Sequence, residues 1–140
     1  STELGAIVAG ADVDARACLA KFGQRLGMAF QVVDDYLGIW GDPKHTGKSA
    51  ASDLFARKKS YPVIYASQNS DNFAAYYQQP NIDIDHTIDI LETSGAKQKT
   101  INQAEKYTSL ALESLAQSGL EGEAVLALEE LLSQLVQRQS

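Results

Sequence analysis

"FQVVDDYLGIWGDPKHTGKSAASDLFARKKSYPV", residues 30–63, contains the most informative pattern in this chain. The adjacent Asp34 and Asp35 are followed by a Gly-Lys pair ending at Lys48, by Asp53, and by a basic cluster at residues 57–59. Acidic and basic groups therefore follow one another over a short distance. A solvated surface needs no such order, whereas a site that holds metal ions against a polyanion does.

The aspartate pair lies on a long predicted helix at residues 12–40, with Asp12 as its N-cap. Apolar residues recur along it every three or four positions, which predicts one buried stripe. These residues are Leu19, Phe22, Leu26, Ala29, Val33, Leu37 and Trp40. Gly41-Asp42-Pro43 is expected to end the helix, and a loop is expected to run to about Ser52.

The rest of the chain is also predicted to be helical, because it is rich in Ala, Leu, Gln and Glu and has few prolines. The further helices are expected near residues 61–68, 71–78, 83–94, 96–118 and 123–138. The third of these is expected to start at Asp83 or Asp85 and to be closed by Gly95. In the 96–118 helix, the predicted inward residues are Ile101, Ala104, Tyr107, Ala111, Leu112 and Leu115. The expected fold class is all-α.

Composition narrows the class of protein. A chain of 140 residues corresponds to one domain or part of one, and a hydrophobic content of 44% is enough to form a core. Its formal net charge of −6 argues against a general nucleic-acid or anionic-membrane binder. The single cysteine, Cys18, fits a reducing cytoplasm. The sequence has no apolar run of about 18 residues, so no membrane-spanning segment is expected.

The spacing of the acidic residues predicts a polar face on the long helix. Gln31, Asp34, Asp35 and Gly38 are three or four residues apart and share one side. Adjacent carboxylates repel each other unless a cation offsets their charge. Mg²⁺ suits that role, because it binds one or two carboxylates together with substrate phosphates and several waters.

The basic residues would hold the anion. Lys48 and Lys58 each offer a compact positive charge that suits phosphate oxygens. "TGK" at residues 46–48 is not a P-loop, because the glycine spacing and the preceding strand of that motif are both missing. We therefore expect an anion held by metal and lysines, without a glycine-rich cradle.

The ordered motifs of this region resemble the second aspartate-rich region of the trans-isoprenyl diphosphate synthases. The matching residues are Phe30-Gln31, Asp34-Asp35, Gly41-Asp42, Gly47-Lys48, Asp53-Leu54 and Lys58 with Pro62. The resemblance continues through residues 90–115 and covers essentially the whole chain. It implies that residues 1–140 are the C-terminal part of a single helical-bundle domain.

The resemblance also implies roles for individual residues. Asp34 and Asp35 would bind Mg²⁺ at the diphosphate of an allylic substrate, and Asp53 would act on the metal through water. Lys48 and Lys58 would contact that diphosphate directly. Gln31 would face the reacting end of the allylic chain.

The implied reaction joins isopentenyl diphosphate to an allylic diphosphate, in a cytoplasmic homodimer. The first aspartate-rich motif of such enzymes is not found in these residues, so residues 1–140 alone are expected to be inactive. Gly38 stands where a third aspartate is usual, and Arg57 stands in place of a glycine. Two alternatives remain: a non-catalytic regulatory or scaffolding subunit of the same fold, and a class I terpene cyclase.

Overall fold

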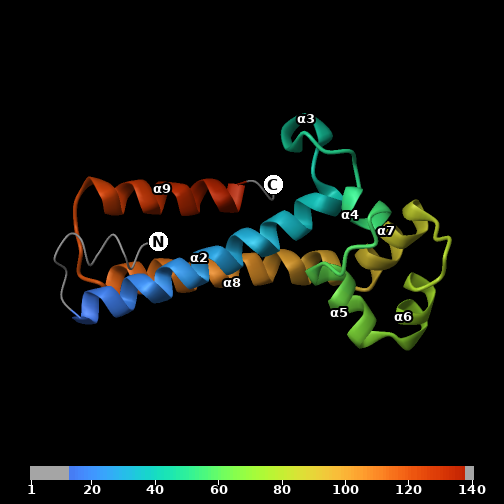
Figure 1. Ribbon diagram of the computed structural model, residues 1–140, viewed down its shortest axis with the longest axis horizontal. Helices are drawn as coiled ribbons and strands as arrows, with labels where there is room; N and C mark the ends of the chain where they lie inside the picture. Colours follow the sequence, from blue (N-terminus) through green and yellow to red (C-terminus); the bar gives the residue numbers. More distant parts are fainter. Residues whose placement is uncertain (1–12, 138–140) are drawn as a thin grey trace. The chain divides into compact units, whose positions relative to one another are not determined.

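Figure 1 shows the computed structural model of the chain, which describes residues 13–137. All regular elements in that range are helices, as expected from the sequence. They are α2 (Val13–Trp40), α3 (Pro43–Thr46), α4 (Ser52–Phe55), α5 (Tyr61–Asn69), α6 (Asp71–Tyr77), α7 (Ile84–Thr93), α8 (Ala96–Gln117) and α9 (Glu123–Gln137). The predicted N-cap, Asp12, and the last predicted helical residue, Arg138, lie outside the described residues.

The segment between α2 and α4 differs from the predicted loop, because it contains the one-turn helix α3. The side chain of Asp42 accepts a hydrogen bond of 2.9 Å from the Lys44 N–H and so caps α3. Pro43 takes the first helical position, where its missing N–H costs nothing. Gly47 ends the turn with a φ of +71°. The Asp-Pro pair that stops α2 therefore also starts α3.

The chain divides into two compact units, and α2 and α8 each contribute to both. The first unit contains residues 13–31 and 103–137, with α9 beside the N-terminal part of α2 (Figure 1). Its core consists of Leu19, Phe22, Ala111, Leu115 and Leu132. These residues come from all three helices, so the first unit is held together by one shared apolar core.

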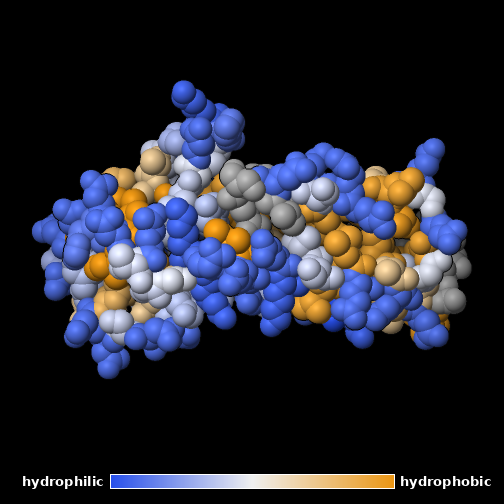
Figure 2. Space-filling model, turned by 180° about the vertical axis from the view of Figure 1, so that it is seen from behind, coloured by the Kyte–Doolittle hydropathy of each residue, from blue (hydrophilic) through white to orange (hydrophobic). Residues whose placement is uncertain are grey.

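A polar contact ties α2 to α8 within the first unit. Arg25 Nη1 donates to the Leu110 carbonyl at 2.9 Å and to Ser114 Oγ at 2.5 Å. Ser114 is buried, whereas Leu112 is 40% exposed. The expectation that Leu112 points inward is therefore wrong. Other large apolar side chains also reach the surface, among them Leu126 and Val13, and Figure 2 shows apolar patches between hydrophilic ones.

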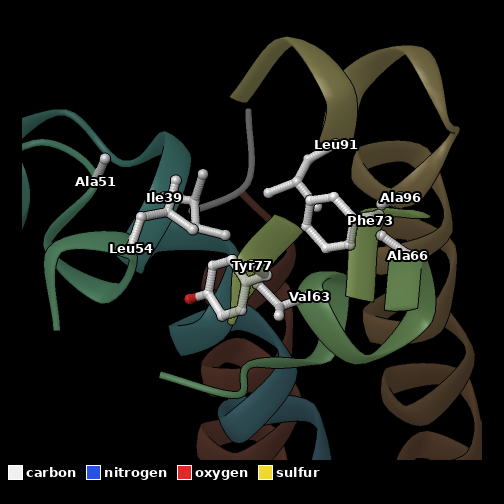
Figure 3. Packing of buried hydrophobic residues seen from close by; sticks show 9 residues of the cluster. All are labelled: Ile39, Ala51, Leu54, Val63, Ala66, Phe73, Tyr77, Leu91 and Ala96. Atoms are coloured by element: carbon white, nitrogen blue, oxygen red, sulfur yellow. The ribbon is translucent and has the colours of Figure 1, made fainter. Parts of the chain in front are cut away.

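The second unit, residues 32–102, contains the acidic and basic residues of the 30–63 stretch. Its core is formed by Ile39, Ala51, Leu54, Val63, Ala66, Phe73, Tyr77, Leu91 and Ala96 (Figure 3). The rings of Phe73 and Tyr77 stack at a centroid distance of 5.8 Å. Helix α5 packs against both α6 and α7. The aspartates of α2 are thus carried by a densely packed unit.

Local signals set the ends of the helices in this unit. Ser70 caps α6 by accepting a hydrogen bond from the Phe73 N–H at 3.2 Å. Asp83 caps α7 in the same way through the His86 N–H at 2.9 Å, so Asp83 and not Asp85 starts this helix. Gly95 follows α7 with a φ of +83°, which confirms its predicted role at the C-terminus of α7.

Candidate functional site

The two adjacent aspartates of α2 have different surroundings. Asp34 is half-exposed, with 54% of its side chain accessible, whereas the side chain of Asp35 is 8% accessible. A helix turns by about 100° per residue, so neighbouring side chains necessarily point in different directions. Asp34 can therefore meet a ligand from solvent, while Asp35 faces the packed interior of the unit.

Both oxygens of Asp35 have protein partners. Oδ1 accepts a hydrogen bond of 2.9 Å from Lys58 Nζ, and Oδ2 accepts one of 2.9 Å from the Tyr61 N–H. Tyr61 is the first residue of α5, and Ser60, its N-cap residue, provides no side-chain hydrogen bond. The N–H groups at a helix start lack partners within the helix and carry partial positive charge. Asp35 thus caps α5 in place of Ser60.

Lys58 lies among three carboxylates. Its Nζ is 2.9 Å from Asp35 Oδ1, 3.5 Å from Asp53 Oδ2 and 3.7 Å from Asp34 Oδ2. Burial alone lowers the pKa of Lys58, but the hydrogen bond to Asp35 and the charges of all three aspartates outweigh it and raise that pKa. The lysine therefore stays charged and reduces the mutual repulsion of the aspartates.

Lys48 supplies a second positive charge. It lies in the segment between α3 and α4, with its Nζ 3.8 Å from Asp34 Oδ1. Both side chains are more than half exposed, so water screens this ion pair and it contributes little to stability. Lys48 can therefore exchange Asp34 for another anion at small cost.

Asp53, on α4, brings a third carboxylate to the site. It is buried, and its Oδ2 forms the ion pair with Lys58 but has no hydrogen-bond partner. A buried carboxylate oxygen without a hydrogen bond is costly, and such atoms often mark a position that a ligand completes. Its carboxylate also lies against Gly38, in the space that a Cβ atom at residue 38 would occupy.

Five of the six residues predicted to form the site are gathered in the second unit. These are Asp34, Asp35, Lys48, Asp53 and Lys58. Gln31 is an exposed residue of α2 and belongs to the first unit. The proximity is a structural fact, whereas the catalytic and binding roles of these residues stay predictions. Sequence reasoning missed the Tyr61 N–H, which donates to Asp35, and Tyr77, whose hydroxyl donates to the Lys58 carbonyl at 3.0 Å. Neither residue gives a signal in the sequence.

The donor atoms fit a divalent metal as a partial ligand set. Within residues 13–137, no group of three or more His, Cys, Asp or Glu side chains is arranged to hold a metal ion. The three aspartates here surround the ammonium of Lys58 instead. Mg²⁺, however, commonly takes only one or two carboxylates and completes its shell with phosphate and water. The accessible Asp34 and the Oδ2 of Asp53, which has an ion pair with Lys58 but no hydrogen bond, suit that mode.

Two further features of the described residues bear on function. No helix within residues 13–137 combines the length and the apolar character needed to cross a membrane. A surface pocket of about 270 Å³ lies between α5 and α6 and is lined by Lys59, Val63, Ile64, Ser67, Gln68, Ala74, Tyr77 and Gln78. None of the predicted site residues lines this pocket.

Sequence comparison relates this chain to prenyl diphosphate synthases. The sequence family described as polyprenyl synthetase matches residues 1–93. A (2E,6E)-farnesyl diphosphate synthase of Mycobacterium bovis is 30% identical over an alignment that covers 100% of this chain and 42% of that protein. A geranylgeranyl diphosphate synthase of Mycobacterium tuberculosis is 51% identical over 55% of this chain and 23% of its own length. The chain thus spans less than half of these relatives.

Solved structures show the same fold. A geranylgeranyl pyrophosphate synthase from Corynebacterium glutamicum, complexed with isoprenyl diphosphate and magnesium, matches 96% of this chain with a TM-score of 0.83 and 27% identity. The match covers 41% of that chain. A polyprenyl synthetase from Streptomyces coelicolor matches 98% of this chain and 44% of its own, with a TM-score of 0.77 and 30% identity. The helical-bundle fold expected from the sequence is confirmed.

Proposed function

This chain belongs to the polyprenyl synthetase family, and we propose that it is part of an enzyme condensing isopentenyl diphosphate with an allylic diphosphate. The observation that carries the proposal is the cluster of three aspartates and two lysines in the second unit. Lys58 Nζ lies within 3.7 Å of all three carboxylates, and Lys48 Nζ lies 3.8 Å from Asp34. Alternating charges of this kind suit a metal–diphosphate complex.

The two lysines would hold the diphosphate of the allylic substrate. Lys48 is accessible and only weakly paired, so it can donate to phosphate oxygens without leaving a buried charge behind. Lys58 is more enclosed and is already oriented by Asp35. A donor fixed before the substrate arrives needs no reorganisation while negative charge develops, and such preorganised donors give large rate effects.

The aspartates would hold Mg²⁺ next to that diphosphate. Asp34 would be the accessible direct ligand, and Asp53 would act through water with its Oδ2, which accepts no hydrogen bond from the protein. Asp35 was expected to be a second direct ligand, but its oxygens already bind Lys58 and the start of α5. We therefore assign the main metal contact to Asp34. When bound, Mg²⁺ supplies Lewis-acid neutralisation of charge on the diphosphate oxygens.

The reaction that fits these groups begins with ionisation. The bond between the allylic carbon and the diphosphate oxygen breaks, and its electron pair leaves with the diphosphate. The double bond of isopentenyl diphosphate then attacks the allylic cation, and loss of a proton restores a double bond. Lys48 and Lys58 stabilise the negative charge on the departing diphosphate. Gln31, one helical turn before Asp34, would face the reacting end of the allylic chain.

Activity of the full-length protein tests this proposal. Condensation of labelled isopentenyl diphosphate with geranyl or farnesyl diphosphate is measured in Mg²⁺ for the wild type and for Asp34→Ala and Lys48→Ala. Loss of a strong contact to developing charge typically costs about 10²–10³ in rate, which we expect for Asp34→Ala. Lys48→Ala should mainly raise KM for the allylic diphosphate. A wild type without turnover, or Asp34→Ala at the wild-type rate, contradicts the proposal.

Two observations favour a second candidate, a non-catalytic subunit of the same fold. Gly38 occupies the position of a usual third aspartate, and residues 13–137 hold no group of three or more metal-ligating side chains. Against this, a subunit without catalysis has no need of the Lys48 and Lys58 arrangement. A turnover measurement distinguishes the two candidate functions. A scaffolding subunit would raise the activity of a partner synthase and have no activity itself. A terpene cyclase would instead release pyrophosphate from an allylic diphosphate without isopentenyl diphosphate.

The predicted homodimer and cytoplasmic location remain part of this proposal. The mass of the full-length protein in solution, measured by light scattering, tests the first. Fractionation of cells that express it from its own gene tests the second.

A further inference from the structure

Arg57 has a backbone conformation that side-chain-bearing residues seldom adopt. Its φ is +56°, in the left-handed region that favours glycine. A residue held in such a conformation needs compensating contacts from its surroundings, and such residues cluster at functional sites. Arg57 immediately precedes Lys58, the lysine that lies among the three carboxylates. The contacts that compensate for this conformation therefore bear directly on the site.

The guanidinium of Arg57 makes those contacts at the C-terminal end of α6. Nη1 donates to the Tyr77 carbonyl at 2.7 Å, and Nη2 donates to the carbonyls of Gln79 at 2.8 Å and Pro80 at 3.0 Å. The Tyr77 carbonyl belongs to the last turn of α6, where carbonyls lack intrahelical partners and carry partial negative charge, so an arginine is favourable there. Gln79 and Pro80 follow the helix. Its Cζ also lies 5.7 Å from the centroid of the Tyr77 ring.

Tyr77 connects Arg57 to Lys58 through hydrogen bonds. The Tyr77 hydroxyl donates to the Lys58 carbonyl at 3.0 Å, while the Lys58 N–H donates to the Asp53 carbonyl at 2.9 Å. Both main-chain groups of Lys58 are therefore fixed. The Tyr77 ring is buried against Phe73 and can shift little. Burial raises the pKa of Tyr77, with Arg57 opposing and Asp53 adding to the effect, so the hydroxyl keeps its proton.

We propose that Arg57 and Tyr77 are positioning residues, which hold the main chain of Lys58 so that its ammonium lies among Asp34, Asp35 and Asp53. The inference rests on the proposed function, because it assigns Lys58 to the diphosphate. A lysine side chain has four flexible bonds, and its ammonium is well placed only if its Cα is fixed. When a substitution far from the reacting atoms misplaces a catalytic group by about 1 Å, the rate can fall about 10²-fold.

Three variants of the full-length protein test the proposal. Tyr77→Phe removes only the hydroxyl that binds Lys58 and keeps the stacked ring. Arg57→Gly removes the guanidinium and accepts a φ of +56° without strain. Tyr76→Phe is the matched control, because the Tyr76 hydroxyl binds Asp83 and Thr87 in the same unit but not Lys58. Thermal melting compares the stability of all three.

The measured quantities are kcat and KM for condensation, and the Kd of inorganic pyrophosphate in Mg²⁺ by calorimetry. The loss of one hydrogen bond typically changes an equilibrium constant about three- to tenfold. For Tyr77→Phe we therefore expect the Kd of pyrophosphate to rise and kcat/KM to fall by about this factor. Arg57→Gly should change both in the same direction. Tyr76→Phe should leave both within about twofold, even if it melts at a lower temperature.

A double-mutant cycle separates positioning from general destabilisation. If Tyr77 acts through Lys58, then Tyr77→Phe should have no further effect on pyrophosphate Kd in a Lys58→Ala background. An equal loss in both backgrounds, or no loss in the wild type, overturns the proposal. A wild type that binds pyrophosphate with this coupling but has no turnover refutes only the proposed function. A wild type with neither pyrophosphate binding nor turnover refutes both.

Discussion

The carboxylate of Asp53 lies against Gly38, so closely that a Cβ atom at residue 38 would overlap it. Gly38 lies on α2, one turn after Asp34, and Asp53 lies on α4. The missing side chain at residue 38 thus makes room for a carboxylate from another helix. Asp53 brings a negative charge to the place where a third aspartate of α2 would begin. The glycine is therefore part of how this site is built.

Replacing Gly38 should disturb the site and not complete it. Gly38→Asp is expected to push Asp53 away from Lys58 and lower kcat/KM about tenfold or more, since preorganised charge is lost. Gly38→Ala adds only the Cβ atom, and overpacking of this kind typically costs about 1–3 kcal/mol in the free energy of unfolding. Urea denaturation and condensation kinetics of the full-length protein measure both effects.

Gly27→Ala is the control for this prediction. Gly27 lies in the same helix, and a Cβ atom there would meet nothing within 4 Å. Alanine is favoured over glycine inside a helix, so this variant should gain about 0.5–1 kcal/mol. If Gly38→Ala were stabilised as Gly27→Ala is, the close contact of Gly38 with Asp53 would not restrict the size of residue 38, and the prediction would be wrong.

The two adjacent aspartates should respond differently to neutral substitution. Asp34→Asn removes an accessible charge and is expected to abolish most activity with little change in the free energy of unfolding. Asp35→Asn alters a buried group that binds both Lys58 and the Tyr61 N–H, so it should destabilise by about 1–3 kcal/mol as well as lower activity. Chemical denaturation and steady-state kinetics distinguish the two. Equal loss of stability in both variants would contradict the different surroundings described above.

Alkaline titration should reveal the ion cluster around Lys58. Its pKa is raised above the ordinary 10.5, so the folded state holds this proton more tightly than the unfolded state does. The resulting stabilisation is complete below pH 10.5 and is lost as pH rises through the raised value. The free energy of unfolding should therefore fall more steeply above pH 10.5 in the wild type than in Lys58→Met. Denaturation in EDTA at several pH values tests this, and parallel curves would refute it.

Residues 1–140 expressed alone should not catalyse condensation. The chain spans 42% of the farnesyl diphosphate synthase that it matches, and residues 13–137 contain no group of three or more metal-ligating side chains. Leu126 and Val13 are also apolar residues with mostly exposed side chains. Activity assays in Mg²⁺ and the mass in solution test this expectation. A cooperatively folding monomer with turnover would overturn it.

The longer helices were predictable because their signals are local, whereas the one-turn helices α3 and α4 were not predicted. In α2 apolar residues recur every three or four positions, and Gly95 ends α7. The start of α7 was predicted at Asp83 or Asp85, and the structure selects Asp83. All these signals act within a few residues. Leu112 was wrongly predicted to point inward. Which of several neighbouring residues of a helix faces the core depends on the helices packed against it. Here Arg25 on α2 binds the buried Ser114, and no local pattern reports that contact.

Five charged residues that lie close together could be picked out from the sequence, but the contacts that each of them makes could not. Asp34, Asp35, Lys48, Asp53 and Lys58 could be selected from order and spacing, and the structure brings them together. Asp35 accepts a hydrogen bond from the Tyr61 N–H at the start of α5, and these two residues are 26 positions apart in the sequence. The support of Lys58 by Tyr77 spans 19 positions in the same way. Such contacts arise from tertiary packing, which spacing along a sequence does not encode.

The hydrogen bond from the Tyr61 N–H to Asp35 also gives the site a spectroscopic reporter. The first amides of a helix usually exchange their protons with water readily, since they lack partners within the helix. The Tyr61 amide donates instead to a buried carboxylate at 2.9 Å, so its exchange should be slow. Any ligand that draws Asp35 away from α5 would speed that exchange and shift the amide resonance. One backbone proton, observed by NMR without labelled substrate, would therefore follow the state of the acidic cluster.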